Sequence, residues 1–452
     1  MSDTIAAVST GSQVCAIGIV RLSGDMAIEI ADRLFKPMSG TKMSASDDRR
    51  LVYGKLFDDE GRLLDICLCT ISRAPNSYTG EDTAEFQCHG SPVVLRAVLD
   101  AAFSLGARQA RAGEFTKRAF LNGRMDLASA EAVADIIDAE TADAARNAAS
   151  QLGGAISRRC DEVYSVLTDI SSHYHAVLDY PDEDIEDFTL EHYRTDIARC
   201  TATLERLRAS YEGGKMLNAG IPAAIVGRPN AGKSSLLNAL LGYDRAIVTD
   251  IPGTTRDTIE EKLRLGGVLL RLTDTAGIRE TADEIERQGV ARSRKAMENA
   301  ALVLAVIDGT EKMCDEDAEI IKCAERAERG IVILSKADLD LACEKPNTAL
   351  PVIEVSSVTG EGLDALGKAV REAFPLPSVP AGEILTNARQ FDAVSRALES
   401  MYAAQEAMSL GQTPDIVLTE TESAMAALGE LTGRTVREEV TNRIFERFCV
   451  GK

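Results

Sequence analysis

Short apolar runs alternate with turns that contain glycine and proline through the first 118 residues. The runs AIGIVRL, LLDICLCTI and TAEFQCHG have the length and composition that are typical of strands. Between them, DMAIEIADRLF and SPVVLRAVLDAAFSLG carry the three- and four-residue apolar spacing of helices. The pattern predicts a small α/β domain over residues 1–118.

The period of the apolar positions changes twice after this domain. Residues 119–215 keep the helical spacing over a long stretch. In residues 216–376, strands such as PAAIVG, ALVLAVIDG and GIVILSKAD alternate with helices, which predicts a parallel sheet with right-handed crossovers. Residues 377–452 are helical again. The predicted fold class is therefore α/β plus all-α, with an α/β domain inserted between two helical stretches that form one bundle.

Charge and composition narrow the possible partners and compartment. The 452 residues include 71 acidic and 50 basic side chains, and the net charge of −21 disfavours non-specific nucleic-acid binding over the whole surface. A local basic patch or a basic partner stays possible. No run of about 18 apolar residues and no basic, apolar leader is present, so we expect a cytoplasmic chain. The ten cysteines are scattered without a C-x-x-C pair, which argues against a zinc ribbon.

The stretch GRPNAGKS, residues 227–234, fits the phosphate-loop pattern G-x-x-x-x-G-K-[ST] between a predicted strand and a predicted helix. Glycines let backbone N–H groups wrap the phosphates, and the helix N-terminus adds positive potential. Lys233 is expected to bridge the β- and γ-phosphates, and Ser234 to ligate Mg²⁺. The predicted nucleotide contacts on this loop are Asn230, Ala231, Gly232, Lys233, Ser234 and Ser235.

Four further motifs follow in the order expected of a GTPase. DTAG follows a strand and offers Asp274 to orient Mg²⁺, and GTTRD offers Thr255 to the metal. SKAD looks like the guanine-reading N-K-x-D motif, in which Asp338 accepts hydrogen bonds from the base, and SSV fits the last base-contacting loop. The residues concerned are Gly253, Thr254 and Thr255; Asp274, Thr275, Ala276 and Gly277; Ser335, Lys336, Ala337 and Asp338; and Ser356, Ser357 and Val358.

Two departures from Ras-type enzymes change the expected chemistry. Ile278 stands where the water-positioning glutamine follows DTAG, so another group has to orient water. Asn230 offers a neutral oxygen where a monovalent cation can supply positive charge, and Glu284 and Glu286 are within reach of the water, although a solvated helix face explains them equally well. Ser335 replaces the motif's asparagine, and a lost hydrogen bond to the base or the phosphate loop would cost about 0.5–1.5 kcal/mol.

Beyond these motifs, NSYTGEDTAEFQCHG, RAGEFTKRAFLNGRMDLASAEAVADII and the final FCVGK resemble the tRNA-modification GTPases of the MnmE/TrmE type, over essentially the whole chain. The resemblance implies a homodimer with an N-terminal folate-binding domain and a helical domain interrupted by the GTPase domain. It also implies an FAD-containing GidA/MnmG partner that forms a heterotetramer. With 5-formyl- or 5,10-methylene-tetrahydrofolate, the complex would add an aminomethyl-type group, often carboxymethylaminomethyl, to C5 of the tRNA wobble uridine, while K⁺ stimulates GTP hydrolysis.

The resemblance also assigns individual residues. It implies a folate site with Arg21, Glu85 and Lys452, in which Arg124 stands for the family's lysine. It implies Glu286 as the residue that orients water, Ser234 and Thr255 as Mg²⁺ ligands, and a tail Cys449 near the folate. The implied K⁺ ligands are Asn230, Thr249, Ile251 and Thr254, on a loop that also contains Asp250 and Pro252. The stretch TGSQVCAIGIVR departs from the family's glycine-rich T-P-x-G-x-G pattern.

Alternatives stay open at this point. Cys449 also suits a buried helix end or, less well, a prenylated C-a-a-X box, because Gly451 and Lys452 are unusual in its last two places. A ribosome-assembly or signalling GTPase, and a folate-binding protein with a regulatory GTPase domain, are the rival functions.

Overall fold

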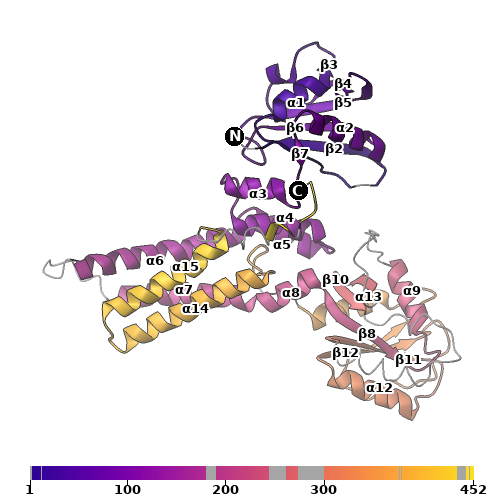
Figure 1. Cartoon of the computed structure of the whole chain (residues 1–452). Helices are drawn as coiled ribbons and strands as arrows, with labels where there is room; N and C mark the ends of the chain where they lie inside the picture. Colours follow the sequence, from indigo (N-terminus) through magenta and orange to yellow (C-terminus); the bar gives the residue numbers. More distant parts are fainter. Residues whose placement is uncertain are drawn as a thin grey trace. The chain divides into compact units, whose positions relative to one another are not determined.

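The computed structural model describes residues 3–11, 13–179, 190–243, 261–272, 300–375, 377, 379–434, 444–446 and 448–451 (Figure 1). These residues fall into two compact units, and each unit combines segments that are distant in the sequence. The first unit comprises Met1–Ala134, Gln151–Glu186 and Glu406–Lys452. The second comprises Asp135–Ser150 and Asp187–Gln405.

A seven-stranded sheet with the order β3-β4-β5-β6-β2-β1-β7 forms the N-terminal part of the first unit. All its neighbours are antiparallel except β1 and β7, which are parallel. The strands are β1 (Ile5–Val8), β2 (Cys15–Ser23), β3 (Phe35–Pro37), β4 (Val52–Phe57), β5 (Leu63–Ser72), β6 (Thr83–Gly90) and β7 (Arg108–Gln109). The helices α1 (Ala27–Leu34) and α2 (Pro92–Ser104) pack against this sheet and share its core. The predicted α/β domain is confirmed.

Side-chain alternation along the strands explains this core. Cys67, Cys69 and Ile71 on β5 are buried, and they pack with Phe86 and Cys88 of β6. The residues between them point to the other face of the sheet, because successive side chains of a strand alternate.

Helices from both ends of the chain pack together in the first unit. Helix α6 (Ala155–Asp179) lies beside α15 (Pro414–Thr432) (Figure 1). His175 Nε2 and Glu422 Oε1, which join the two helices, are 2.9 Å apart. Helix α15 begins with Pro414 in its first turn and ends at Gly433, which has a positive φ of 89°. The two helical stretches on either side of the inserted domain therefore do pack together. The unit also contains α3 (Glu114–Leu121) and most of α4 (Leu127–Asp138).

A six-stranded sheet with the order β13-β12-β11-β8-β10-β9 forms the second unit's α/β part, and only β9 is antiparallel. This result confirms the predicted parallel sheet. The strands are β8 (Ile221–Gly227), β9 (Glu261–Leu265), β10 (Val268–Leu272), β11 (Leu302–Asp308), β12 (Arg329–Ser335) and β13 (Val352–Val355). The helices are α9 (Lys233–Tyr243), α12 (Asp315–Arg326) and α13 (Leu363–Ala373).

Both faces of this sheet are covered, which is why its strands are nearly continuous apolar runs. One core joins alternate residues such as Ile225 and Leu304 to α9 and α13. The other joins the intervening residues, such as Val226 and Ala305, to α12. Because the strands are parallel, β8, β11, β12 and β13 all end at the same edge. Strand β8 lies between β10 and β11, which is the position where such sheets bind ligands.

The remaining helices of the second unit extend from this α/β part. They are α7 (Leu190–Ala209), α8 (Tyr211–Ala219), and most of α5 (Ala142–Leu152) and α14 (Ala388–Ser409). The Tyr402 hydroxyl donates a 2.6 Å hydrogen bond to Glu205 Oε1, and Tyr211 stacks on Phe391 with ring centroids 4.3 Å apart. Within the parts of the chain that the structure describes, no helix is long and apolar enough to cross a membrane.

Candidate nucleotide site and N-terminal hollow

The phosphate loop occupies residues 228–232, between the end of β8 and the start of α9. Asn230 and Gly232 have positive φ angles of 64° and 93°, a conformation that glycine and asparagine tolerate best. A Cβ on Gly227 would lie 2.4 Å from the carbonyl oxygen of Val306 on the neighbouring strand, so a larger residue does not fit there. The glycines of the motif therefore serve both the turn and the close approach of two strands.

Lys233, the first residue of α9, folds back over this loop. Its Nζ donates hydrogen bonds to the carbonyl oxygens of Gly227 at 2.9 Å and Arg228 at 2.7 Å. Burial lowers the pKa of Lys233, because the charged ammonium loses solvation. Ser234 and Ser235 follow in the first turn of α9, and both are exposed. The ammonium and the helix N-terminus thus converge where a phosphate chain can be bound.

The two predicted base-reading loops are joined to each other. The N–H of Ala337 donates to the carbonyl oxygen of Val355 at 3.2 Å. The buried Ser356 hydroxyl donates to Asp338 Oδ1 at 2.6 Å and orients the carboxylate, which belongs to an exposed residue. Ser357 is half-buried and Val358 is exposed beside them. SKAD and SSV therefore form one surface at the carboxyl edge of the sheet.

Lys336 supports this surface from the neighbouring strand end. It has a positive φ of 58°, which is uncommon for a residue other than glycine. Its Nζ lies 2.5 Å from Asp308 Oδ2 at the end of β11. Burial alone would raise the pKa of Asp308, but the hydrogen bonds from Lys336 and Thr310 lower that pKa below its ordinary value. The ion pair joins the SKAD loop to the end of β11.

Ser335 contacts the phosphate loop through its hydroxyl. Its Oγ lies 2.7 Å from the carbonyl oxygen of Ala231 and 3.0 Å from that of Ile307, and the residue is 3% exposed. A hydroxyl has one proton, so it donates to one of these carbonyls at a time. The serine that replaces asparagine therefore lies within hydrogen-bonding distance of the phosphate loop. The sequence had placed in doubt a hydrogen bond to the base or to this loop.

Several predicted site residues lie outside the described residues. Asn230 is exposed on the described loop, but the other implied K⁺ ligands, the metal-binding Thr255, the DTAG motif and both candidate glutamates are not described. The undescribed residues are Thr249, Asp250, Ile251, Pro252, Gly253, Thr254, Thr255, Asp274, Thr275, Ala276, Gly277, Ile278, Glu284, Glu286 and Lys452.

In the N-terminal sheet, Arg21 and Glu85 stand directly opposite each other on β2 and β6. Arg21 Nε and Glu85 Oε1 are 2.7 Å apart, and the side chains are 22% and 26% exposed. The guanidinium carbon of Arg21 also lies 5.5 Å from the ring centroid of Tyr78 and 5.7 Å from that of Phe115. The two residues that the resemblance assigned to folate are thus brought together, beside two aromatic rings.

Glu85 and Tyr78 line a hollow of about 290 Å³ on this sheet. The Tyr78 hydroxyl and Thr116 Oγ1 are hydrogen-bonded at 2.9 Å, which fixes the ring. The hollow is lined by Arg49, Leu51, Thr70, Ser72, Tyr78, Thr83, Glu85 and Gln87. Its mixture of an aromatic ring, a carboxylate and hydroxyls suits a flat, polar, small molecule.

Arg124 approaches the loop that carries Tyr78. A Cβ on Gly80, whose φ is 78°, would lie 3.2 Å from Arg124 Cγ and 2.8 Å from Asn122 Cβ. Asn122 Nδ2 also donates to the carbonyl oxygen of Thr79 at 2.7 Å. Arg124 is exposed next to this loop.

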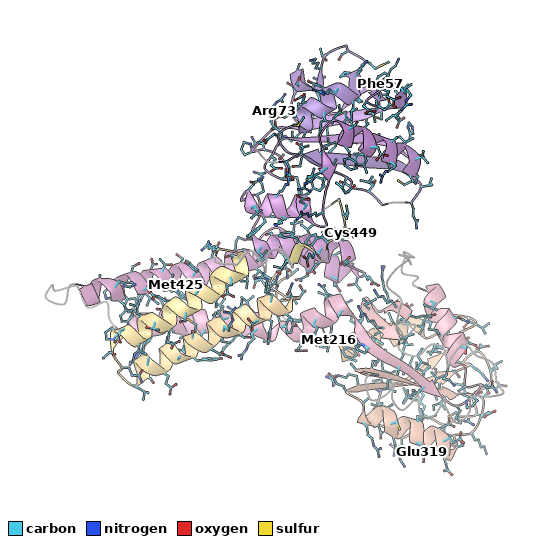
Figure 2. The ribbon with its side chains drawn as sticks, in the orientation of Figure 1. Phe57, Arg73, Met216, Glu319, Met425 and Cys449 are labelled. Atoms are coloured by element: carbon cyan, nitrogen blue, oxygen red, sulfur yellow. The ribbon has the colours of Figure 1, made fainter. Side chains whose placement is uncertain are left out.

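The C-terminal tail lies on the N-terminal part of the first unit, where Figure 2 labels Cys449. The N–H of Gly113 donates to the carbonyl oxygen of Cys449 at 3.3 Å, and Ala112 and Val450 form an antiparallel bridge. A Cβ on Gly451 would lie 2.2 Å from the carbonyl oxygen of Val8. The Cys449 side chain is exposed, which contradicts the alternative of a buried helix end. Its backbone is held by the contacts of the neighbouring residues with the N-terminal part of the chain.

Sequence reasoning missed the group that supports the Tyr78 loop. Arg118 is largely buried, and its guanidinium lies 2.7 Å from both Glu81 Oε2 and Asp3 Oδ1. The Ser23 hydroxyl also donates to Glu81, at 2.8 Å. A lone arginine inside the helical pattern EFTKRAFL was the only local signal. Asp3 and Glu81 are distant from Arg118 in the chain.

A second missed group is a cluster of side chains near the start of β5 and the end of β6. One ligand-type atom from each of Asp65, Cys67 and Cys88 lies within 4.8 Å of the others. Contact with the Cys67 thiol, together with burial, raises the pKa of Cys88. Both cysteines belong to the apolar core, so packing accounts for them.

Comparison with known proteins decides the family. A family model described as the MnmE helical domain matches residues 127–449, which is more than half of the chain. The chain belongs to the MnmE family. A second model, described as the GTP-binding protein TrmE N-terminus, matches residues 4–124 of this MnmE chain.

Curated relatives match this MnmE chain from end to end. The protein from Symbiobacterium thermophilum named tRNA modification GTPase MnmE is 42% identical over 456 residues, covering 100% of this chain and 99% of its own. The proteins of that name from Roseiflexus sp. strain RS-1 and Clostridioides difficile are 43% and 39% identical, and each alignment covers 100% of this chain. They cover 99% and 100% of the relatives. This MnmE chain is accordingly a GTPase.

Proposed function

We propose that this MnmE chain couples GTP hydrolysis to modification of tRNA. As a cytoplasmic homodimer with an FAD-containing GidA/MnmG partner, it would transfer a tetrahydrofolate one-carbon unit into an aminomethyl-type group on C5 of the wobble uridine. The observation that carries the proposal is the presence, in one chain, of the converging GTP loops and the hollow lined by Glu85, with which Arg21 pairs. The end-to-end match to proteins named tRNA modification GTPase supports it.

In the GTP reaction, Lys233 and the loop N–H groups hold the β- and γ-phosphates. The exposed Ser234 hydroxyl at the start of α9 fits a Mg²⁺ ligand, and we assign Thr255 as its companion. Bound Mg²⁺ would neutralise charge that develops on the phosphate oxygens. We assign the water-orienting role to Glu286, in place of the glutamine that Ile278 replaces.

A K⁺ site at Asn230 would supply the positive charge of an arginine finger, because Asn230 is an exposed amide on the phosphate loop. Thr249, Ile251 and Thr254 would complete it. We expect GTP turnover to be faster in K⁺ than in Na⁺ at equal ionic strength, and Asn230→Ala to abolish the difference. A wild-type rate that is the same in both salts would refute this part.

Guanine selectivity rests on Asp338, whose carboxylate is oriented by Ser356. A carboxylate accepts hydrogen bonds from guanine N1–H and its 2-amino group, and adenine has no 2-amino group. Asp338→Asn is expected to move the preference from guanine toward xanthine. Equilibrium titrations in which wild-type protein binds ATP as well as GTP would contradict the assignment.

For the folate, Glu85 is suited to accept hydrogen bonds from a pterin-like ring, and Tyr78 offers an aromatic face in the same hollow. Arg21 holds Glu85 in place, and Arg124 and Lys452 would neutralise the carboxylates of the folate tail. A tetrahydrofolate bound here would supply the one-carbon unit, and Cys449 would act on the modification reaction rather than on GTP.

We assign residues 1–118 to folate binding and dimerisation, and residues 216–376 to GTP binding and hydrolysis. We assign residues 119–215 and 377–452 to the helical domain, which bears the C-terminal tail. The deciding experiment is mass analysis of wobble uridine in tRNA from a strain that lacks this protein, before and after complementation. Complementation with Cys449→Ser should restore GTP turnover but not full modification. If the deletion leaves wobble uridine fully modified, a binding-switch GTPase or a folate protein with a regulatory GTPase domain becomes the better description.

A further inference from the structure

The phosphate loop is held from outside by a pair of charged side chains. Arg228, the first residue after β8, donates from Nε to Asp317 Oδ1 at 2.7 Å, and its Nη2 lies 3.2 Å from Glu311 Oε2. Asp317 is 0% exposed, whereas the side chain of Arg228 is 20% exposed. The hydrogen bond that Arg228 donates to Asp317 raises the pKa of Arg228, so the guanidinium is charged at all working pH values. Arg228, which belongs to the phosphate-loop motif, thus directs its charged guanidinium toward α12.

Asp317 is itself fixed within the first turn of α12. Its Oδ2 accepts a 3.1 Å hydrogen bond from the N–H of Cys314, which precedes the helix. An unpaired carboxylate this deeply buried would be strongly destabilising, so its partner is a structural requirement. Arg228 satisfies it, and the phosphate loop becomes attached to the rigid end of a helix.

The main chain of Arg228 contacts the ammonium group of Lys233 directly. Its carbonyl oxygen accepts hydrogen bonds from Lys233 Nζ at 2.7 Å and from the N–H of Ala231 at 3.3 Å. Arg228 therefore has two functions at once. Its side chain anchors it to α12, and its carbonyl positions the amine that meets the phosphates.

A second tether acts at the other end of the loop, where the Ser335 hydroxyl lies 2.7 Å from the Ala231 carbonyl oxygen. Asn230 lies between the two tethered residues and Gly232 directly follows Ala231, and both have positive φ. Such a loop has many alternative conformations when it is free, and ordering them opposes binding. Fixing residues 228 and 231 in advance removes part of that entropic penalty.

We propose that Arg228 is a positioning residue for GTP, and that the Arg228–Asp317 pair preorganises the phosphate loop without touching the nucleotide. The proposal concerns only the GTP site and does not depend on the folate or tRNA assignments. It differs from a packing role because the predicted defect is in affinity for nucleotide and in the placement of Lys233.

The test compares purified full-length wild type with Arg228→Met, Asp317→Asn and the double variant. Arg326→Met, at an exposed position on the last turn of α12, is the matched control. Fluorescent GDP titration gives Kd and the fraction of protein that binds, and steady-state GTP hydrolysis gives kcat and KM. We expect Kd and KM to rise about tenfold in Arg228→Met, with the control unchanged, as for loss of a charged hydrogen bond.

Two features separate positioning from misfolding. A misfolded fraction lowers the amount of binding protein but leaves the Kd of the remainder unchanged, whereas a positioning defect raises Kd at full amplitude. The double variant should be no worse than the poorer single variant, because both remove the same pair. Arg228→Lys keeps the charge but not the planar fork, and should fall between wild type and Arg228→Met.

The proposal fails if Arg228→Met binds GDP with wild-type Kd, or if the effects of Arg228→Met and Asp317→Asn simply add. If Asp317→Asn does not fold, the proposal is still tested by the Kd values of Arg228→Met, Arg228→Lys and Glu311→Gln. In that set, Glu311→Gln should have the smallest effect, because Glu311 is a more exposed partner at a longer distance.

Discussion

The phosphate loop and the N-terminal hollow are built from different parts of the chain: the first mainly from main-chain atoms, and the second from side chains. The phosphate loop is one continuous stretch, residues 227–234, that works largely through main-chain atoms and one lysine. The hollow is assembled from side chains on β5, β6 and two loops, and its lining residue Glu85 pairs with Arg21 on the neighbouring strand β2. A main-chain site depends on backbone conformation, so its determinants are glycines and tethers. A side-chain site depends on each group separately, so single substitutions there should act without disturbing the other site.

The largest expected effect tests the main-chain site at its one essential side chain. Lys233→Ala should lower kcat for GTP hydrolysis by about 10²–10³-fold, as for removal of a preorganised donor to developing charge. Binding of 5-formyl-tetrahydrofolate should not change. Steady-state kinetics and folate titration on the same preparation measure both quantities. The matched control is Lys322→Ala, at an exposed position on α12. An equal loss of folate binding would mean that the two sites are not separate.

The second prediction concerns the residue that orients water. Glu286→Ala should lower kcat on the order of 10²-fold and leave GTP affinity intact, because a positioning group acts in the transition state. Glu284→Ala, which changes the other nearby carboxylate, is the control and should stay near wild type. A higher KM with unchanged kcat would show that Glu286 only binds. A larger loss of kcat in Glu284→Ala than in Glu286→Ala would show that Glu284, and not Glu286, orients the water.

The side-chain site is tested by Arg21→Met. Loss of the charged hydrogen bond to Glu85 should weaken binding of 5-formyl-tetrahydrofolate by at least about tenfold. GTP turnover should stay within about twofold of wild type, since the substitution lies in the other unit. Calorimetric titration measures the affinity, with Arg96→Met on the exposed face of α2 as the control. Unchanged folate affinity would remove Arg21 from the site and leave its pair with Glu85 as a structural feature.

The smallest expected effect refines the tether at the far end of the phosphate loop. Ser335→Ala removes the hydroxyl that bonds the Ala231 carbonyl, and should weaken GTP binding by about two- to tenfold, the equivalent of 0.5–1.5 kcal/mol. The preference for guanine over xanthine should not change, in contrast to Asp338→Asn. Competition titrations with both nucleotides distinguish the two variants. A changed base preference in Ser335→Ala would show that the serine reads the base directly.

Local patterns predicted the nucleotide site because its parts are local. A strand, a glycine turn and a helix are contiguous in residues 221–243. Parallel strands bring SKAD and SSV to the same edge wherever the rest of the chain lies. The family resemblance implied that Arg21 and Glu85 belong to one folate site, and the strand register that sets them opposite each other appears only in the structure.

The remainder of the sites depends on contacts between distant residues. No short pattern indicates that Val450 pairs with Ala112, or that Arg118 neutralises carboxylates near residues 3 and 81. The hydrogen bond from Ser335 to the phosphate loop likewise joins residues that are 104 positions apart. Such contacts depend on how whole helices and strands pack. A short stretch of sequence therefore does not indicate which distant residues it will contact.

The pairing of α6 with α15 has a consequence for the order of folding during synthesis. The α/β part with β8 to β13 is encoded by one continuous stretch and can complete its sheet while the chain is still being made. Helix α6 emerges earlier, but α15, the helix that it packs against, is made more than two hundred residues later. During that interval α6 exposes surface that is buried in the finished molecule. The nascent chain is therefore expected to need chaperone protection for this helix more than for the GTPase part, although α6 is made first.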